Sequence, residues 1–414
     1  MDRKTAGIAL IATLDSKGAE ASYLKEKLEA LGRSVLILDV GTSGVPKCLA
    51  DIPRERVAAQ APGYSECEDQ GAMLRAMAKG AGRILADLAS NAKITAIGGI
   101  GGGKGAGVFH QASCGLPFGF PKVLISSARP ALLAEIATTS DTILMPTLVD
   151  LFGVNRLTRT ILDNAVAVLS ELKWNPPAQR QGKTVAITAF GVTTPAVEAI
   201  KADLELAGIE VIVFPANGAG GRTMEALIAK RQFEGVVDLT TTEMVDLRLG
   251  GTASAGSARL TAAGKAGIPQ LIAPGAVDMA NFGPPETVPE RFGDRTTYRH
   301  TPMTTLVRTT AEDMVEIARM TADRLNDAKS PVAVVWPRHG VSDYDRSGHP
   351  FHDPAANIAW RQAIGQYLRS DIPIMDTDCH INDREFASLC AEWMIEQLNE
   401  NECETLPGMK SSLA

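Results

Sequence analysis

The stretch "AIGGIGGGKGAGVFH", residues 96–110, places seven glycines within the ten positions from 98 to 107. It follows the apolar run "ITAIGG" (94–99) and leads into a helical pattern. Strand, glycine-rich turn and helix in this order are typical of a parallel α/β sheet. At such a turn, free N–H groups meet the positive end of the helix dipole, and glycine lets an anion approach the backbone. The stretch therefore predicts an α/β fold and an anion site, above all for nucleotide phosphate.

The same rhythm of short apolar runs and helical patterns extends in both directions from this stretch. In the first half it predicts strands at 7–13, 34–40, 94–99, 122–127 and 141–146, with helices at 19–31, 66–90 and 155–172. In the second half it predicts strands at 184–191, 209–216, 234–240, 268–275, 331–337 and 372–378, with helices at 194–207, 220–231, 311–328, 355–369 and 383–398. We therefore expect an α/β protein with two doubly wound, Rossmann-like parallel sheets in tandem.

A polar segment with two prolines, "KWNPPAQRQGK" (173–183), interrupts the rhythm and predicts the domain boundary. The chain of 414 residues is long enough for two cores. We expect a nucleotide-binding domain over 1–175 and a second α/β domain over 183–414, with loops rich in His and Asp near the C-terminus.

Composition excludes several classes of protein. The net charge is -7 and no segment is strongly basic, which argues against a nucleic-acid partner. The longest apolar runs have the length of strands, so we expect no membrane span. The first apolar run lacks a cleavage pattern and reads as the first strand of a cytoplasmic protein. The six cysteines form no CxxC pair, which favours reduced structural thiols.

The glycine stretch nearly matches a Walker A loop. Gly98, four further residues, Gly103 and Lys104 have the right spacing, but Gly105 stands where Ser or Thr would hold Mg²⁺. The alternative interpretation is a tight turn that lets the next helix pack closely.

The stretch also matches a relaxed dinucleotide fingerprint at Gly101, Gly103 and Ala106. That fingerprint belongs after the first strand of a Rossmann unit, whereas this one follows the third. The next strand ends in Ser126 and Ser127 rather than in an acid that could bind a ribose. We therefore expect a nucleotide other than NAD, with Mg²⁺ as a candidate companion of its phosphates.

Loops at the same edge of the sheet should complete the nucleotide pocket, because ligands bind beyond the carboxyl ends of parallel strands. The turn after the first strand supplies a hydroxyl, an acid and an amine, although it could equally be a capped helix start with solvated charges. The predicted cofactor-binding residues are Thr13, Asp15, Lys17, Thr42, Gly98, Gly99, Gly101, Gly102, Gly103, Lys104, Ser126 and Ser127.

A second glycine-rich turn, "ANGAGGR" (216–222), precedes a helix in the second half and offers an arginine to an anion. The segment "FGVTTP" (190–195) adds two hydroxyls at a neighbouring strand end. We expect a small anionic substrate here, in a cleft between the domains; a tight turn and helix capping are the alternatives. The predicted substrate-binding residues are Thr193, Thr194, Gly218, Gly220, Gly221 and Arg222.

Five of the six histidines lie in the last 115 residues, with acids nearby. We single out Asp278, His300 and His380 as candidate catalytic residues, because mixed His and Asp groups do acid–base work or bind a divalent metal. No spacing matches a known zinc signature, so the metal stays undefined, and such pairs also serve to hold loops.

Several motifs together resemble the ATP-binding domain family named for the tomato mosaic virus resistance protein. They are "TLDSKGAE" (13–20), "IGGIGGGKGAG" (97–107), "FPKVLISS" (120–127), "FGVTTPAVE" (190–198), "FPANGAGGRTME" (214–225), "DMANFGP" (278–284), "GVSDYDRSGHPFHDP" (340–354) and "HINDREFA" (380–387). The resemblance covers nearly the whole chain. It implies a two-domain α/β protein, a dimer or higher homo-oligomer, that binds ATP in its first half.

Three functions remain open from the sequence. The first is an ATP-dependent transferase or ligase that acts on a small anionic substrate. The second is a nucleotide-binding regulatory module without turnover, which the missing Walker Ser or Thr favours. The third is a metal-assisted lyase or hydrolase that uses the C-terminal His and Asp residues.

Overall fold

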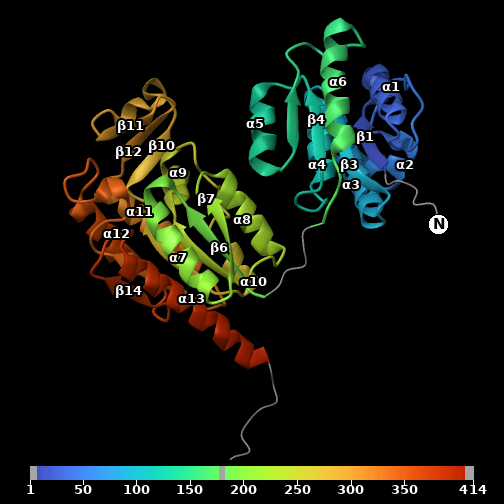
Figure 1. Cartoon of the computed structure of the whole chain (residues 1–414). Helices are drawn as coiled ribbons and strands as arrows, with labels where there is room; N and C mark the ends of the chain where they lie inside the picture. Colours follow the sequence, from blue (N-terminus) through green and yellow to red (C-terminus); the bar gives the residue numbers. More distant parts are fainter. Residues whose placement is uncertain (1–6, 177–181, 406–414) are drawn as a thin grey trace, which may run out of the picture. The chain divides into compact units, whose positions relative to one another are not determined.

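The chain folds around two separate parallel β-sheets, one in each half of the sequence (Figure 1). The computed structural model describes residues 7–176 and 182–405, with side chains up to residue 400. It divides into two units, Met1–Gln179 and Arg180–Ala414, called here the N-terminal and C-terminal units. The division falls within the proline-containing segment 173–183, of which residues 177–181 lie outside the described ranges.

The N-terminal unit contains a five-stranded parallel sheet in the order β2-β1-β3-β4-β5. Its strands are β1 (Gly7–Ala12), β2 (Val35–Asp39), β3 (Ile94–Gly101), β4 (Lys122–Ser126) and β5 (Ile143–Pro146). β1 is buried along its whole length, as expected for an apolar strand covered on both faces. Because β2 lies on one side of β1 and β3 on the other, the direction of winding reverses between β1 and β3.

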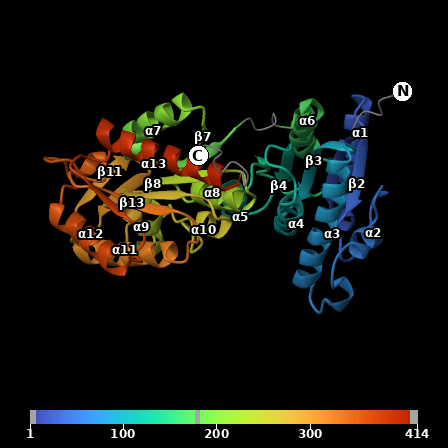
Figure 2. The same cartoon turned by 90° about the horizontal axis from the view of Figure 1, so that it is seen from below.

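Helices cover both faces of this sheet (Figure 2). The first face packs against α1 (Leu14–Ala30) and α6 (Arg156–Glu171). The second packs against α3 (Gln70–Ser90), α4 (Gly103–Ser113) and α5 (Pro130–Thr139), with α2 (Arg54–Ala59) beside α3. Leu24 and Leu162 belong to the first core, and Met77 and Phe109 to the second; all four are fully buried.

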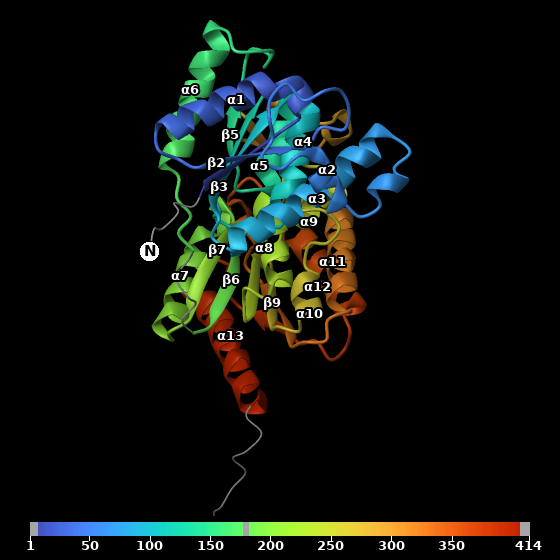
Figure 3. The same ribbon diagram turned by 90° about the vertical axis from the view of Figure 1, so that its right-hand side faces the viewer.

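The C-terminal unit contains a six-stranded parallel sheet in the order β14-β13-β9-β8-β6-β7. Its strands are β6 (Thr184–Ala189), β7 (Glu210–Pro215), β8 (Gly235–Thr240), β9 (Gln270–Gly275), β13 (Val332–Pro337) and β14 (Ile374–Thr377). α7 (Thr194–Leu206) and α13 (Arg384–Thr405) lie on one face. The other face carries α8 (Ala219–Ala229), α9 (Thr242–Leu249), α10 (Ala262–Ala266), α11 (Ala311–Leu325) and α12 (Pro354–Tyr367) (Figure 2 and Figure 3).

A small antiparallel sheet is added to the C-terminal unit (Figure 1). It consists of β10 (Met279–Phe282), β12 (Thr304–Arg308) and β11 (Thr297–Thr301), in that order. Single 3₁₀ turns complete the described structure: η1 (Tyr64–Glu66), η2 (Gly191–Thr193), η3 (Pro285–Thr287), η4 (Glu290–Phe292) and η5 (Asp343–Asp345). β11 is exposed at every position, which explains why its polar sequence gave no strand pattern.

The predicted fold class is confirmed: both units are doubly wound parallel sheets with helices on each face. Element bounds differ at the first helix, which was expected from residue 19, and at the last, which was expected to end at residue 398 and ends at Thr405. α1 begins at Leu14 and contains a non-helical residue, Lys17, with φ of −121°. β3 continues to Gly101, two residues beyond the predicted end. Gly101, which was expected in the turn, thus lies in the strand.

Candidate functional site

A pocket of about 420 Å³ lies in the N-terminal unit at the carboxyl ends of β1 and β3, where the strand order reverses. In open α/β sheets this reversal leaves a crevice between the loops that leave the two strands, and ligands bind there. The turn after β1, the loop after β2 and the starts of α3 and α4 line the pocket. Of the predicted cofactor-binding residues, those that line it are Thr13, Asp15, Lys17, Thr42, Gly102, Gly103 and Lys104.

Three of the predicted glycines serve packing inside the unit and are absent from this lining. A Cβ added to Gly98 would lie 2.8 Å from Leu10 Cδ2, and one on Gly99 would lie 2.3 Å from Phe109 Cδ2. A Cβ on Gly101 would lie 2.8 Å from the Cα of Gly105. The tight-packing alternative therefore describes these three positions, and we do not retain them as ligand contacts.

The start of α4 presents free backbone donors to the pocket. Gly102 is the N-cap residue and no side chain caps the helix. A Cβ on Gly103 would meet nothing within 4 Å, so protein packing does not require glycine at this lining position. Lys104 Nζ donates to Gln70 Oε1 at 2.7 Å, which ties the start of α4 to the start of α3. Uncapped N–H groups, open space and an amine suit an anion.

The turn after β1 brings an acid and a second amine to the same pocket. Asp15 Oδ1 is buried and has no hydrogen-bond partner in the described structure. Lys17 Nζ donates to the carbonyl oxygen of Leu151. A buried carboxylate oxygen without a donor costs free energy, which a bound cation or hydroxyl would recover.

Asp39, at the end of β2, holds the turn and the loop in place. Its Oδ1 accepts hydrogen bonds from the backbone N–H groups of Leu14 at 3.1 Å and Gly41 at 2.9 Å. Its Oδ2 accepts from Arg54 Nε at 2.7 Å. The side chain is 1% exposed, so it braces the pocket from behind. The sequence offered a signal for this role, an acid directly after an apolar strand.

The two predicted serines of β4 have different surroundings. Ser126 is buried, and its Oγ accepts from the N–H of Ala128 at 3.0 Å, which makes it a turn residue. Ser127 Oγ donates to Oδ1 of Asp150 at 2.8 Å, and Asp150 lines the pocket. Asp150 and Gln70 were missed, because neither lies in a recognisable motif of the sequence.

In the glycine-rich turn of the C-terminal unit (216–222), three backbone N–H groups already have hydrogen-bond acceptors within the protein. Glu243 Oε1 accepts from the backbone N–H groups of Gly218 at 2.7 Å and Gly221 at 3.2 Å. The N–H of Gly220 donates to Asn217 Oδ1 at 3.0 Å. A buried carboxylate thus occupies the amides that we expected a substrate to use, and only Arg222 of this group lines a pocket described below.

Glu243 belongs to a buried ionic cluster. Its Oε2 lies 2.5 Å from Arg259 Nε, and Arg259 Nη2 lies 2.6 Å from Asp238 Oδ1. Glu225 Oε1 lies 3.2 Å from Arg259 Nη1. Arg259 is 1% exposed, so these buried pairs connect β8, α8 and α9.

The two predicted threonines of this unit bond to the protein itself. Thr193 is fully buried, and its hydroxyl lies 2.7 Å from the hydroxyl of Thr240. Thr194 Oγ1 donates to the carbonyl oxygen of Phe190 at 3.3 Å. The two hydroxyls thus serve the protein's own packing, and neither caps the start of α7, where no side-chain cap is formed.

Two of the three predicted catalytic residues, Asp278 and His380, meet around Ser342. Ser342 Oγ donates to Asp278 Oδ2 at 2.7 Å, and its carbonyl oxygen accepts from His380 Nε2 at 3.0 Å. His380 Nδ1 accepts from the N–H of Asn382 at 3.1 Å, so both ring nitrogens are used. His300 lies on exposed β11 and contacts the hydroxyl of Tyr344 at 2.9 Å instead.

Burial controls the charges of this cluster. It lowers the pKa of His380 below its usual range, because burial disfavours the charged imidazolium. Burial, with the nearby Asp345 carboxylate, raises the pKa of Asp278 to about 7. Arg308 opposes this shift, and its Nη2 lies 3.9 Å from Asp345 Oδ1. Asp278 and His380 are 0% and 3% exposed, which suits loop architecture better than contact with a substrate.

Residues 7–176 and 182–405 bear on two further expectations, metal binding and membrane insertion. In these ranges no three His, Cys, Asp or Glu side chains are grouped so that they could hold a metal ion. No helix there has the combined length and apolar character needed to cross a membrane. The cytoplasmic location stays a prediction.

Two family models match the chain in succession. The N-terminal domain of the uncharacterised protein family UPF0261 matches residues 6–173, and the C-terminal domain of the same family matches residues 182–398. A UPF0261 protein of Clostridium tetani is 37% identical over 402 residues, which cover 95% of this chain and 99% of the relative. The UPF0261 protein RA0729 of Rhizobium meliloti is 38% identical over 387 residues, which cover 92% and 96%.

The resemblance to a tomato protein is also confirmed. The ToMV resistance protein Tm-1(GCR237) of Solanum lycopersicum is 35% identical over 336 residues, which cover 79% of this chain and 45% of the tomato protein. Among solved structures, the glycosyltransferase SnogD from Streptomyces nogalater aligns at 13% identity and a TM-score of 0.21, too low to carry an argument.

Proposed function

Since the chain belongs to the UPF0261 family, we propose that its N-terminal unit binds ATP with Mg²⁺ in the pocket between β1 and β3. We further propose that the protein is a metabolic enzyme, a transferase or ligase, acting on a small anionic substrate. The resemblance that the sequence motifs carry implies the nucleotide.

One observation carries the proposal: the uncapped start of α4 opens into a pocket at the reversal of strand order. Gly103 lines this pocket and lacks any packing reason to be glycine. The buried, unpartnered Oδ1 of Asp15 is a second group there that needs a ligand. These features fit a phosphate with its cation better than an apolar ligand.

The basic and acidic residues of the pocket would bind different parts of the nucleotide. The N–H groups at the start of α4, with Lys104 and Lys17, would hold phosphate oxygens. Asp15 and Asp150 would hold Mg²⁺ or a ribose hydroxyl. When bound, the nucleotide supplies a transferable phosphoryl or adenylyl group, and the two amines would offset the negative charge that develops on it.

A second candidate is a nucleotide-binding module without turnover. Gly105 stands where a Walker loop has its Mg²⁺-binding hydroxyl, and this observation favours the module. Overnight incubation with ATP and candidate metabolites distinguishes the two, because the module leaves ATP intact. The lyase or hydrolase reading lacks support, since both ring nitrogens of His380 are occupied.

We also propose that the chain forms a homodimer or a higher homo-oligomer, as the family resemblance implies. Leu148 and Phe152, in the loop between β5 and α6, are 99% and 81% exposed and would gain from burial against a second copy. Light scattering on a size-exclusion column decides this; a particle of monomer mass contradicts it.

The first test is titration calorimetry of the full chain with ATP, ADP and NAD, with and without Mg²⁺.

Gly103→Val fills the open space at the start of α4 and is expected to weaken ATP binding about tenfold or more, which equals about 1.4 kcal/mol. Lys104→Ala removes one phosphate partner and should act in the same direction. Gly107→Ala is the control, because it lies in the same helix but does not line the pocket. Unchanged affinity in Gly103→Val, or no nucleotide binding by the wild type, refutes the proposal.

A further inference from the structure

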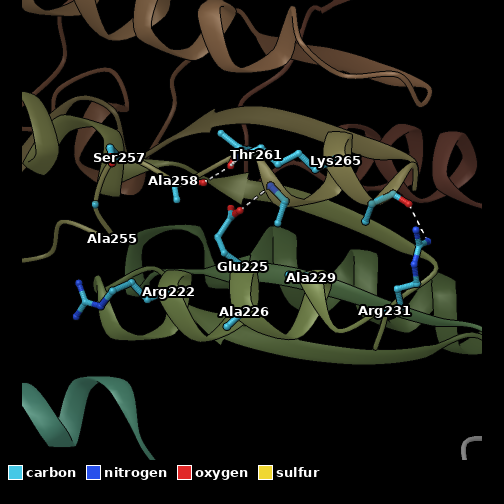
Figure 4. Close-up of a pocket in the computed structure, with 13 residues that line it drawn as sticks. Arg222, Glu225, Ala226, Ala229, Arg231, Ala255, Ser257, Ala258, Thr261 and Lys265 are labelled. Atoms are coloured by element: carbon cyan, nitrogen blue, oxygen red, sulfur yellow. Dashed lines mark hydrogen bonds between the residues drawn. The ribbon is translucent and has the colours of Figure 1, made fainter. Parts of the chain in front are cut away.

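A second groove, of about 660 Å³, lies wholly within the C-terminal unit between α8 and the segment 255–266 (Figure 4). Its volume falls in the range of about 300–1,000 Å³ that is typical of small-molecule sites. The methyl groups that form its walls come from Ala226, Ala229, Ala255, Ala258, Ala262 and Ala266. None of its thirteen lining residues is aromatic, so the groove offers no ring on which a nucleobase could stack.

Three cations lie along this apolar groove. Arg222 comes from the first turn of α8, Arg231 follows its last turn, and Lys265 lies on α10 opposite (Figure 4). Arg222 Nη1 donates to the carbonyl oxygen of Ser254 at 2.8 Å, while its Nε is buried with no partner in the described structure. A buried guanidinium N–H without an acceptor costs free energy that an anionic ligand would recover.

The other two cations already have hydrogen-bond partners within the protein. Arg231 has a left-handed φ of 56°, and its Nη1 donates to the carbonyl oxygen of Ala266 at 2.9 Å, which caps α10. Lys265 is exposed and contacts the hydroxyl of Thr261 at 3.1 Å. They add positive charge to the rim, whereas Arg222 alone has an unused buried donor.

Glu225 is the one acid in the lining, and the protein already uses its carboxylate. Oε1 accepts from the N–H of Leu260 at 2.6 Å and from Arg259 at 3.2 Å. Oε2 accepts from the N–H of Ala262 at 2.8 Å. Below it, Arg259 also pairs with Asp238 and Glu243. The lining therefore offers free donors and no free carboxylate, which selects an anion over a cation.

We propose that this groove binds an aliphatic carboxylate. The carboxylate group pairs with Arg222, and the hydrocarbon chain lies along the alanine walls between α8 and α10. Aliphatic chemistry follows from the walls, which are apolar and lack aromatic rings. The inference is independent of the nucleotide pocket, because every lining residue belongs to the C-terminal unit.

The test uses the full chain, octanoate as the probe and octylammonium as a probe of equal length and opposite charge. Saturation-transfer NMR and calorimetry measure the binding of each. Octanoate should bind and octylammonium should not. Arg222→Gln should weaken octanoate binding about tenfold, since it removes the charge-assisted pair. Ala226→Trp places a large ring from an exposed position of α8 into the groove and should abolish binding.

Lys230→Gln is the matched control, because Lys230 is an exposed cation next to the groove that does not line it. It should bind octanoate like the wild type. The proposal is overturned if octanoate fails to bind at millimolar concentration, if Ala226→Trp binds it normally, or if octylammonium binds equally well. If Arg222→Gln fails to fold, the comparison of octanoate with octylammonium and the Ala226→Trp variant still test the proposal. ATP binding, measured in parallel, reports separately on the nucleotide pocket.

Discussion

At the scale of single residues, the glycines of the opening stretch divide into two kinds. Gly98 and Gly99 are glycine because neighbouring side chains leave no room for a Cβ. Gly103 has no such neighbour and lines the pocket instead. The sequence alone cannot separate the two kinds, because the distinction depends on what packs against each Cα.

This division predicts opposite stability effects within one motif. Gly99→Ala should lower the free energy of unfolding by about 1–3 kcal/mol, because its Cβ would lie 2.3 Å from the Phe109 ring. Gly107→Ala, in the interior of α4 with open space around it, should raise it by about 0.5–1 kcal/mol. Urea denaturation measures both; equal effects would contradict the assignment.

Asp278 predicts a dependence of stability on pH. Its pKa is raised to about 7 in the folded protein, against about 3.9 in an unfolded chain. Between these values the folded state retains a proton that the unfolded state releases, so stability should fall as the pH rises from about 4 to 7.

Asp278→Asn removes this titration and should increase stability at pH 8 relative to wild type, by an amount on the order of a few kcal/mol. Chemical denaturation from pH 5 to pH 8 is the measurement. Asp246, whose pKa burial also raises to about 7, and Asp345 will keep part of the slope. A slope unchanged from wild type would exclude Asp278 as its source.

At the scale of elements, buried acidic side chains hydrogen-bond to the loops that follow the strands and hold these loops in place. Asp39 connects the end of β2 to the first residue of α1 and to the loop before Arg54. Glu243 does the same for the start of α8 in the C-terminal unit. In the N-terminal unit, no side chain caps the nearby start of α4. In the C-terminal unit, Glu243 itself accepts hydrogen bonds from backbone N–H groups at the start of α8.

Asp39→Ala should therefore destabilise the N-terminal unit by about 2–4 kcal/mol, since it leaves two backbone N–H groups and the Nε of Arg54 without an acceptor. Hydrogen exchange at Leu14 and Gly41 should accelerate. Glu29→Ala is the control, because its exposed pair with Lys25 contributes less than about 1 kcal/mol. Equal losses in the two variants would argue against the bracing role.

At the scale of the whole molecule, the chain consists of two units with separate sheets and separate cores. One family model matches the chain up to residue 173 and the other from residue 182 onward, so the boundary between them falls at residues 174–181. The N-terminal pocket and the alanine groove each draw all their lining residues from a single unit.

We expect a fragment of residues 1–179 to fold alone and to bind ATP with the affinity of the full chain. Circular dichroism should show a cooperative thermal transition, and calorimetry should reproduce the titration. The complementary fragment 180–414 should bind octanoate and not ATP. A fragment 1–179 that is unfolded in isolation would show that its stability depends on the second unit.

The sequence by itself determined the fold class, because apolar strands of fixed length and helical periodicity are local properties. It also indicated Lys104 and Asp15, which follow directly from the ends of strands. The tertiary structure alone decided which glycines line the pocket and which pack against Phe109 or Leu10, since these neighbours are supplied by the packing of other parts of the fold. It alone revealed that Glu243 fills the second glycine turn, and that Asp278 and His380 meet in a buried cluster. A residue's contacts depend on long-range packing, which no local pattern encodes.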